Sequence, residues 1–214
     1  MSRWLIAFAA ACSLQAQAHH AELLPPLDFE PPAPGTYTLH RIMPAPEGRV
    51  LGVDGRPAAL SSYTRGKITL LGFIYTTCVD PNGCPLAYRV FDALKESIDA
   101  TPPLHGKVRF VTLSFDPLRD TPGAMQQYAG SRAVEKGAGL RWYFLTTRSA
   151  RELRPLVEGF GQDVQSSRGR SELSHVLKVF LIDRAGDIRE IYTSNFLHPQ
   201  MVLNDIQTLL DEEP

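Results

Sequence analysis

Two cysteines, Cys78 and Cys84, stand six positions apart in the segment CVDPNGCP. Thiolates bind soft metal ions such as Cu(I), and two neighbouring thiols can also exchange electrons by forming a disulfide. The residues Pro81, Asn82 and Gly83 between them have the composition of a turn, which can reverse the chain and bring the two sulfur atoms together. The pair is therefore compatible with a structural disulfide, a redox-active pair or a metal site. A zinc site is the weakest of these readings, because no second cysteine pair exists.

The cysteine segment lies between a predicted strand and a predicted helix. Residues 68–75 form a continuous apolar run, which is typical of a strand covered on both faces. Pro85 is suited to the first turn of a helix. Apolar residues at helical spacing follow it, namely Leu86, Val90, Phe91, Leu94 and Ile98. Because the N-terminus of a helix favours negative charge, it lowers the pKa of a cysteine and makes it a better nucleophile and metal ligand.

One imidazole would complete a low-coordinate Cu(I) site with two thiolates. Among the six histidines, His175 is the candidate, because it precedes a predicted strand, Val176 to Asp183, that would lie beside the central strands. The other five have ordinary interpretations as surface, capping or terminal residues: His40 and His105 in loop-like contexts, His198 before the proline of the last helix, and His19 and His20 near the start of the chain.

Composition excludes several classes of protein. The chain has 214 residues, of which 43% are hydrophobic, and 22 basic residues against 23 acidic ones give a formal net charge of −1. A disordered chain would combine low hydrophobicity with high net charge, and a nucleic-acid-binding face would need an excess of basic residues. The length suits one well-buried core of roughly 150 residues with extensions.

Residues 1–18 have the pattern of a secretory signal peptide, with Arg3 as the only charge, a short apolar run and a small-x-small cleavage site at Ala16-Gln17-Ala18. The apolar run is too short to span a bilayer, so no permanent membrane anchor is expected. Cleavage after Ala18 removes Cys12 and leaves Cys78 and Cys84 as the cysteines of the mature chain. Acylation of Cys12 in a lipoprotein is the less favoured alternative, because no larger aliphatic residue stands three places before it.

The remaining chain divides into a proline-rich, extended lead-in at residues 19–49 and a domain at 50–214. In the domain, predicted strands and helices alternate, which indicates an α/β protein with a mixed sheet. Pro155 is expected to shorten or kink the helix at 148–160. The elements expected after the first strand and helix are a strand at 108–115, a helix at 122–128, a strand at 141–145, a helix at 148–160, a β-hairpin at 176–192 and a helix at 199–210. This order is that of a thioredoxin-like fold: a mixed central sheet flanked by helices, with a β-hairpin near the C-terminus.

Residues from about Val50 to Leu210 resemble the Sco/SenC family of thioredoxin-like copper-binding proteins. The resemblance rests on the strand that runs through FIYTTC to Cys78, on Cys84-Pro85-Leu86, and on the string SFDPLRDTP at residues 114–122. It continues in Ser174-His175 and in VFLID at residues 179–183. One departure is that family members have three residues between the cysteines, whereas this chain has five.

The resemblance implies that Cys78, Cys84 and His175 bind copper. It also implies a cuproprotein recipient, such as the CuA site of cytochrome c oxidase subunit II, a periplasmic thiol reductant and a periplasmic location. Asp116 and Asp120 correspond to family aspartates near the site. Read from the residues alone, Asp116 is a turn residue and Asp120 marks a helix start, with Asp120 or Thr121 as its cap.

Two other functions remain open at this point. The first is a thiol-disulfide oxidoreductase that acts on a partner's cysteine pair without copper, in which one cysteine attacks and the other resolves the mixed disulfide. The second is a redox or copper sensor. The thioredoxin Cys-x-x-Cys motif is absent, and Leu71 and Tyr75 stand where a peroxiredoxin would have Pro and Thr.

Overall fold

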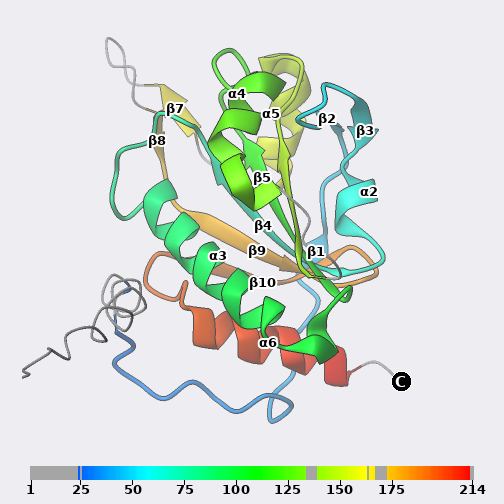
Figure 1. The fold of residues 1–214 in the computed structure, drawn as a ribbon, viewed down its shortest axis with the longest axis vertical. Coiled ribbons are helices and arrows are strands. Elements are labelled where there is room, and N and C mark those ends of the chain that lie inside the picture. The colour runs from blue at the N-terminus through cyan, green and yellow to red at the C-terminus, as the bar shows by residue number, and fades with distance from the viewer. Residues whose placement is uncertain (1–23, 25, 134–138, 163, 167–172, 213–214) are drawn as a thin grey trace, which may run out of the picture.

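The apolar runs predicted as strands form the centre of a six-stranded sheet with the order β1-β10-β9-β4-β5-β6 (Figure 1). The computed structural model describes residues 24, 26–133, 139–162, 164–166 and 173–212, and only the backbone of 165, 166 and 173–175. The predictions for the signal peptide at 1–18, Cys12, His19 and His20 lie outside these residues.

The sheet is mixed, as predicted. β4 (Ile68–Ile74), β5 (Val108–Ser114) and β6 (Arg141–Leu145) run parallel to one another. β9 (Lys178–Ile182) is antiparallel to β4, and β10 (Asp187–Thr193) returns antiparallel to β9 as the predicted hairpin. β1 (Met43–Pro44) closes the edge against β10. All the residues of β4 and β5 are buried, which explains why their sequences lack an apolar–polar alternation.

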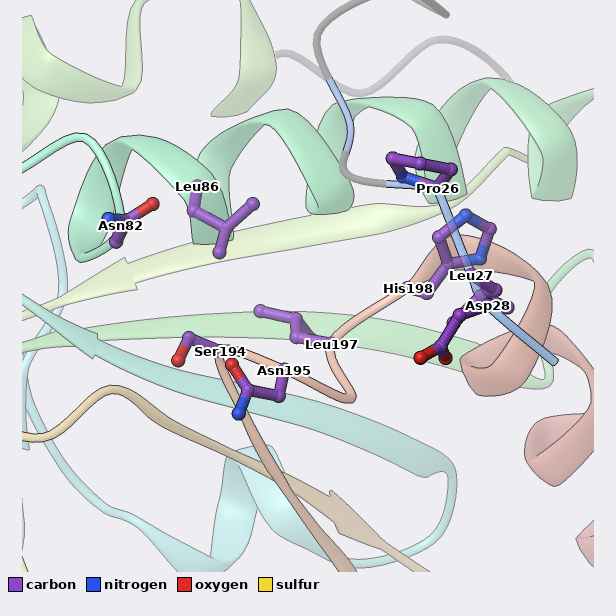
Figure 2. Close-up of a pocket in the computed structure, with 9 residues that line it drawn as sticks. All are labelled: Pro26, Leu27, Asp28, Asn82, Leu86, Ser194, Asn195, Leu197 and His198. Carbon is purple, nitrogen blue, oxygen red and sulfur yellow. The ribbon is translucent and has the colours of Figure 1, made fainter.

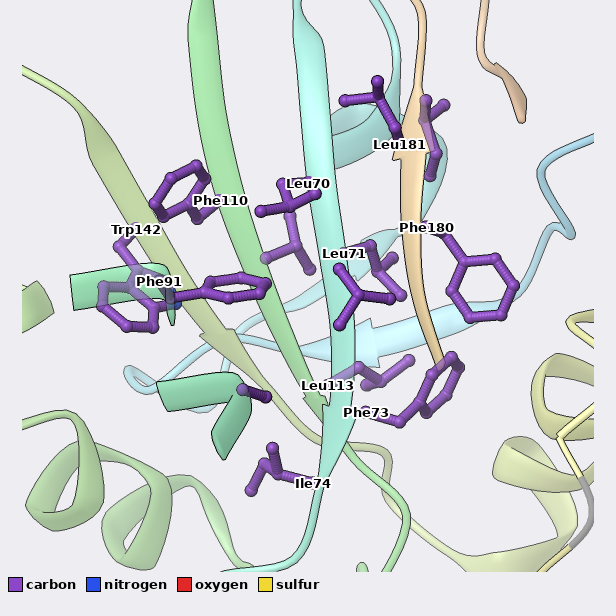
Figure 3. Close-up of a cluster of buried hydrophobic side chains, with 14 of the residues drawn as sticks. Leu70, Leu71, Phe73, Ile74, Phe91, Phe110, Leu113, Trp142, Phe180 and Leu181 are labelled. Carbon is purple, nitrogen blue, oxygen red and sulfur yellow. The ribbon is translucent and has the colours of Figure 1, made fainter. Parts of the chain in front are cut away.

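Helices cover both faces of the sheet. Successive strand side chains point to opposite faces, and this alternation in β4 separates two aromatic groups (Figure 3). On the face of Leu70 and Ile74, Phe91 of α3 (Cys84–Asp99) packs edge-on against Phe110, with ring centroids 5.0 Å apart. On the other face, Phe73 meets Phe160, which follows α5 (Ala150–Gly159), at 5.3 Å. α4 (Pro122–Ala129) and α6 (Pro199–Asp211) complete the set of long helices.

The predicted lead-in forms hydrogen bonds with the last helix and the last strand of the chain. The Tyr37 hydroxyl donates to Asp205 of α6 at 2.5 Å, and the Gly35 N–H donates to Thr208 of the same helix at 3.0 Å. The Arg189 guanidinium of β10 donates to the Leu39 carbonyl at 2.8 Å. The described part of the lead-in is therefore an integral part of the fold.

Several short elements carry too few residues to show a period in the sequence. They are β2 (Arg49–Leu51), β3 (Pro57–Ala59), α2 (Ser61–Thr64), β7 (Val164–Ser166) and β8 (Leu173–His175). β2 pairs with β3, and β7 pairs with β8, each as a separate two-stranded ladder. α5 is shorter than predicted, as Pro155 suggested, but it continues through that residue to Gly159.

The strand that His175 was predicted to precede, Val176 to Asp183, begins later than expected. β9 begins at Lys178, and His175 ends a separate short strand, β8. The backbone of His175 pairs with Val164 of β7. The apolar pair Val176 and Leu177 made the strand look longer than it is, because these two residues link β8 to β9 outside any ladder.

Candidate functional site

The cysteine loop leaves the central strand β4 and enters α3, whose first residue is Cys84. Hydrogen bonds inside the loop fold it back on itself. The Cys78 N–H donates to the Tyr75 carbonyl at 3.1 Å, and the Gly83 N–H donates to the Asp80 carbonyl at 3.0 Å. The Asp80 side chain also accepts from the Asn82 N–H at 3.0 Å. These bonds form the turn expected from Pro-Asn-Gly.

The loop brings the two cysteine side chains together as free thiols within hydrogen-bonding reach of each other. The Cys84 thiol donates to the Cys78 sulfur, which lowers the pKa of Cys78 to about 5 in spite of partial burial. The backbone N–H groups of Cys84 and Asp80 and the Tyr75 hydroxyl lower it further. Cys78 is therefore a thiolate at neutral pH, stabilised by the N–H of Cys84, the first residue of α3, as expected for a helix N-terminus, and by the Asp80 N–H of the loop.

Cys84 has the opposite character. Its hydrogen bond to Cys78 and its burial raise its pKa well above the usual value, so it stays protonated at neutral pH. It is only 1% exposed, whereas Cys78 is half-buried. A reactant from solution therefore meets a thiolate first, and a buried thiol lies directly behind it.

A fully buried carboxylate, Asp120, supports the loop from the segment between β5 and α4. It accepts from the Thr76 N–H at 3.1 Å and from the Thr76 hydroxyl, and it accepts from the Ser114 hydroxyl at 2.5 Å. Thr76 lies two residues before Cys78, and Ser114 ends β5. Asp120 thus connects the carboxyl ends of two parallel strands and fixes the origin of the cysteine loop.

The other residues of the SFDPLRDTP string have local structural roles. Asp116 pairs with Arg119 at 3.2 Å near the surface. Of the two predicted caps for α4, Thr121 is the one used, since its hydroxyl accepts from the Ala124 N–H at 3.3 Å. The turn at Asp116 and the helix start after Asp120 agree with the interpretation made from the residues alone. What the sequence did not indicate is that Asp120 bonds to Thr76.

The histidines differ in their hydrogen bonds and in how much of each residue the structure describes. His198 caps α6, with Nδ1 accepting from the Gln200 N–H at 3.2 Å, and His105 bonds to the Asp99 carbonyl at 2.9 Å. His175 is placed by its backbone alone, at the end of β8. Among the side chains that are described, which exclude that of His175, no group of three or more His, Cys, Asp or Glu is arranged to hold a metal ion. The described side chains at the site that can ligate a soft metal ion are those of Cys78 and Cys84.

A cavity of about 460 Å³ adjoins the cysteine loop (Figure 2). Asn82 of the loop and Leu86 of α3 form one side, and the segment between β10 and α6 forms another. The lead-in contributes the third side. The complete lining is Pro26, Leu27, Asp28, Asn82, Leu86, Ser194, Asn195, Leu197 and His198. The cavity therefore lies where three segments distant in sequence meet, next to Asn82 of the cysteine loop.

Sequence reasoning missed Tyr75 and Thr76 as parts of the site. Tyr75 is buried at the end of β4 and its hydroxyl donates to Cys78, while Thr76 carries the bonds to Asp120. Their position directly between the central strand and Cys78 was the available signal. It could not identify the partners, because these depend on which side chains the fold brings to the same edge of the sheet.

The sequence and the fold have counterparts among known proteins. The family model described as SCO1/SenC matches residues 49–211. No curated protein matches the chain. Among the described residues, no helix has the length and apolar character needed to cross a membrane.

Solved Sco structures share the thioredoxin-like fold. Apo Sco1 of Thermus thermophilus is 25% identical, with a TM-score of 0.61 over 82% of this chain and 95% of its own. Copper-bound ScoI of Arabidopsis thaliana is 19% identical, with a TM-score of 0.63 over 78% of this chain and 97% of its own. BsSco, described as a Sco family cytochrome c oxidase assembly protein with a disulfide switch, is 21% identical, with a TM-score of 0.65 over 82% of this chain and 99% of its own.

Proposed function

Because the chain belongs to the SCO1/SenC family, we propose that it holds a copper ion through Cys78, Cys84 and His175 and delivers it to another copper protein. The observation that carries the proposal is the pairing of a Cys78 thiolate with the Cys84 thiol at the start of α3. Two sulfur donors on one short loop form a soft ligand pair, which favours Cu(I) over harder divalent ions. ScoI of Arabidopsis thaliana, which has the same fold, was solved with copper bound.

The two cysteines play different parts in loading. Cys78 is already ionised at neutral pH, so it binds the incoming ion without first losing a proton. Cys84 keeps its proton until the metal displaces it, since a ligating thiol must be deprotonated and metal binding releases protons. His175 supplies the third ligand, which requires its neutral imidazole. Release to the recipient proceeds by ligand exchange, beginning at the more accessible Cys78.

We place the chain in the periplasm, after cleavage of residues 1–18. The recipient is a cuproprotein such as the CuA site of cytochrome c oxidase subunit II. BsSco belongs to a family of cytochrome c oxidase assembly proteins, which supports this choice of recipient. A thiol reductant keeps Cys78 and Cys84 reduced, because an oxidised pair offers no thiolates for the metal.

Titration of the reduced chain at residues 19–214 with Cu(I), in competition with a chromogenic Cu(I) chelator, tests the site. We expect equimolar binding with a Cu(I)–thiolate absorption band. Cys78→Ser, Cys84→Ser and His175→Ala should each weaken it by about tenfold or more, as loss of a metal ligand or its support does. His40→Ala is the matched control, because His40 is exposed in the lead-in. Undiminished binding by either cysteine variant would exclude the proposed site, and undiminished binding by His175→Ala would exclude His175 from it.

A second function, thiol-disulfide exchange, is favoured by the same asymmetry of the pair. The Cys78 thiolate would attack a partner disulfide, forming a mixed disulfide and releasing one partner thiolate. Cys84, after losing its proton, would then attack the Cys78 sulfur and release the second partner thiolate. The partner gains two electrons, the chain is left with a Cys78–Cys84 disulfide, and an external thiol reductant must restore it. Trapping of a mixed disulfide by Cys84→Ser, together with reductase activity that survives His175→Ala, would identify this function.

A further inference from the structure

The most exposed large apolar side chains among the described residues are Leu118, Val79, Val176 and Phe196, at 83%, 75%, 59% and 51% exposure. They come from four different loops: the cysteine loop, the segment after β5, the link between β8 and β9, and the segment after β10. Isolated exposed apolar residues are ordinary, but several gathered at one place mark an interaction surface.

The sheet topology gathers these four loops at one end. β4 and β5 are parallel, so the loops that follow them, with Val79 and Leu118, leave the same edge. β9 is antiparallel to β4, so the link that precedes β9, with Val176, reaches that edge as well. β10 is antiparallel to β9, and Thr193 at its end pairs with Lys178, which places Phe196 there too. In Figure 1, the β8 segment, the loop that enters α3 and the loop that enters α6 all lie on the left side of the view.

The Cys78–Cys84 pair lies at the same end, because Cys78 directly precedes Val79. We propose that Val79, Leu118, Val176 and Phe196 form an apolar rim that docks the recipient protein around the thiol pair. The inference rests on the proposed function, since a ligand-exchange step requires the recipient's own ligand to reach the metal held by Cys78. The recipient must therefore cover the loops around Cys78 whenever it takes the ion.

The charged side chains around this rim are of both signs. Arg119, beside Leu118, is ion-paired with Asp116 within its own loop. Asp80, beside Val79, accepts a backbone N–H but has no ion pair among the described residues. Arg89 of α3 donates to the Pro81 carbonyl of the cysteine loop at 3.4 Å. The apolar side chains therefore define the partner: a protein surface that is apolar around its metal ligands, with a basic group at its edge that can pair with Asp80.

The cavity beside the rim adds a second feature of a docking site. Asn195 and Leu197, which flank Phe196, line it together with Asn82 of the cysteine loop (Figure 2). Its volume of about 460 Å³ is ample for a side chain from the partner. Asn82, Ser194 and Asn195 place amide and hydroxyl groups at its wall, and Leu86 and Leu197 supply apolar surface.

The docking test uses the isotope-labelled, reduced chain at residues 19–214 and the metal-free soluble domain of a cytochrome c oxidase subunit II as the probe. We expect NMR shift changes at the loops that carry Val79, Leu118, Val176 and Phe196. Leu118→Ser and Phe196→Ser, combined, should weaken the complex by about tenfold, as loss of central apolar contacts does. Ile42→Ser is the matched control, since Ile42 is 50% exposed but bonds to Ile188 at the other end of β10.

Three results would each overturn the proposed docking surface. They are NMR shift changes centred away from these loops, no complex with the wild-type chain, and a double variant that binds the probe like the wild type. The NMR spectrum of each variant reports its folding directly. Cu(I) titration of the same samples reports separately on the proposed function. A wild-type chain that binds the probe through the rim but fails to bind Cu(I) would retain the docking surface and reject the copper site.

Discussion

The backbone N–H of Thr76 donates to the buried Asp120 carboxylate at 3.1 Å, across 44 positions of sequence. This bond fixes the exit of the chain from β4, two residues before Cys78. One Asp120 oxygen accepts from the Thr76 N–H and the Ser114 hydroxyl, and the other accepts from the Thr76 hydroxyl, so this buried side chain is the acceptor for three donors.

We expect Asp120→Ala to lower the free energy of unfolding by about 2–4 kcal/mol, because it leaves the buried Thr76 N–H and the two hydroxyls without their acceptor. Urea denaturation measures this loss. Asp116→Ala is the control, since it removes the pair with Arg119 near the surface, which is worth about 1 kcal/mol or less. Equal effects of the two substitutions would show that Asp120 does not anchor the loop.

The low pKa of Cys78 predicts an unusual pH dependence of alkylation. Cys78 is protonated below pH 5 and ionised above it, so its rate with iodoacetamide should rise through about pH 5 and level off before neutrality. An ordinary thiol, with a pKa near 8.5, would instead gain about tenfold per pH unit up to that value. Mass spectrometry of the alkylated, reduced protein locates the label.

Replacement of Cys84 tests the cause of that shift. Cys84→Ala removes the thiol that donates to Cys78, so the midpoint of alkylation should move to higher pH. Cys84→Ser retains a hydroxyl donor and is the matched variant, with a midpoint closer to that of the wild type. A midpoint that is unchanged in Cys84→Ala would assign the shift instead to the backbone N–H groups of residue 84 and Asp80 and to the Tyr75 hydroxyl.

Burial raises the pKa of Asp205, whose carboxylate accepts from Tyr37 at 2.5 Å and from Tyr192 at 2.5 Å. A carboxyl group with a raised pKa in the folded state favours folding while protonated, and this contribution is lost as pH rises through the folded pKa. We therefore expect the wild type to lose stability relative to Asp205→Asn as pH rises above about 4, the ordinary pKa of an aspartate in the unfolded chain. Urea unfolding at several pH values measures the difference.

The control for this pH effect is Asp211→Asn, at the exposed end of the same helix. Glu190 also has a pKa raised by burial and, to a smaller extent, by the charge of Asp205, so Asp205→Asn also lowers the pKa of Glu190 and the pH-dependent difference reports on both carboxyl groups. A stability difference between wild type and Asp205→Asn that stays constant with pH would contradict the prediction.

Two glycine substitutions should act in opposite directions. A Cβ on Gly159, at the end of α5, would lie 2.8 Å from two atoms of the Pro46 ring, whereas one on Gly123 in α4 meets nothing within 4 Å. Alanine in a helix gains about 0.5–1 kcal/mol over glycine, and forced overpacking costs about 1–3 kcal/mol. Gly123→Ala should therefore raise the thermal midpoint, and Gly159→Ala should lower it.

The central part of the fold was predictable because its signal is local. β4 and β5 are apolar throughout, and their observed bounds differ from the predicted ones by a single residue at the end. β1 was hidden in the proline-rich lead-in, because two residues carry no period. α5 continues through Pro155 because that residue lies on the exposed side, while Leu153 and Leu156 pack inward.

The two thiols of the site could be predicted from the sequence, but the residues that position and ionise them could be predicted only in part. Proline, asparagine and glycine between the cysteines indicated the turn, and the helix start after Gly83 indicated a stabilised thiolate. The bond from Thr76 to Asp120 and the opposite ionisation of Cys78 and Cys84 depend on contacts between separate elements and on burial. No local pattern contains that information.

The attachment of the lead-in to α6 has a consequence for the order of folding. Tyr37 and Asp205 are 168 positions apart, and β1 pairs with β10. During synthesis, the first described segment has no partner until the last helix has left the ribosome. Such long-range contacts close late, because the entropy of a large loop is lost before they form. The chain therefore completes its fold only after the whole of α6 has been synthesised.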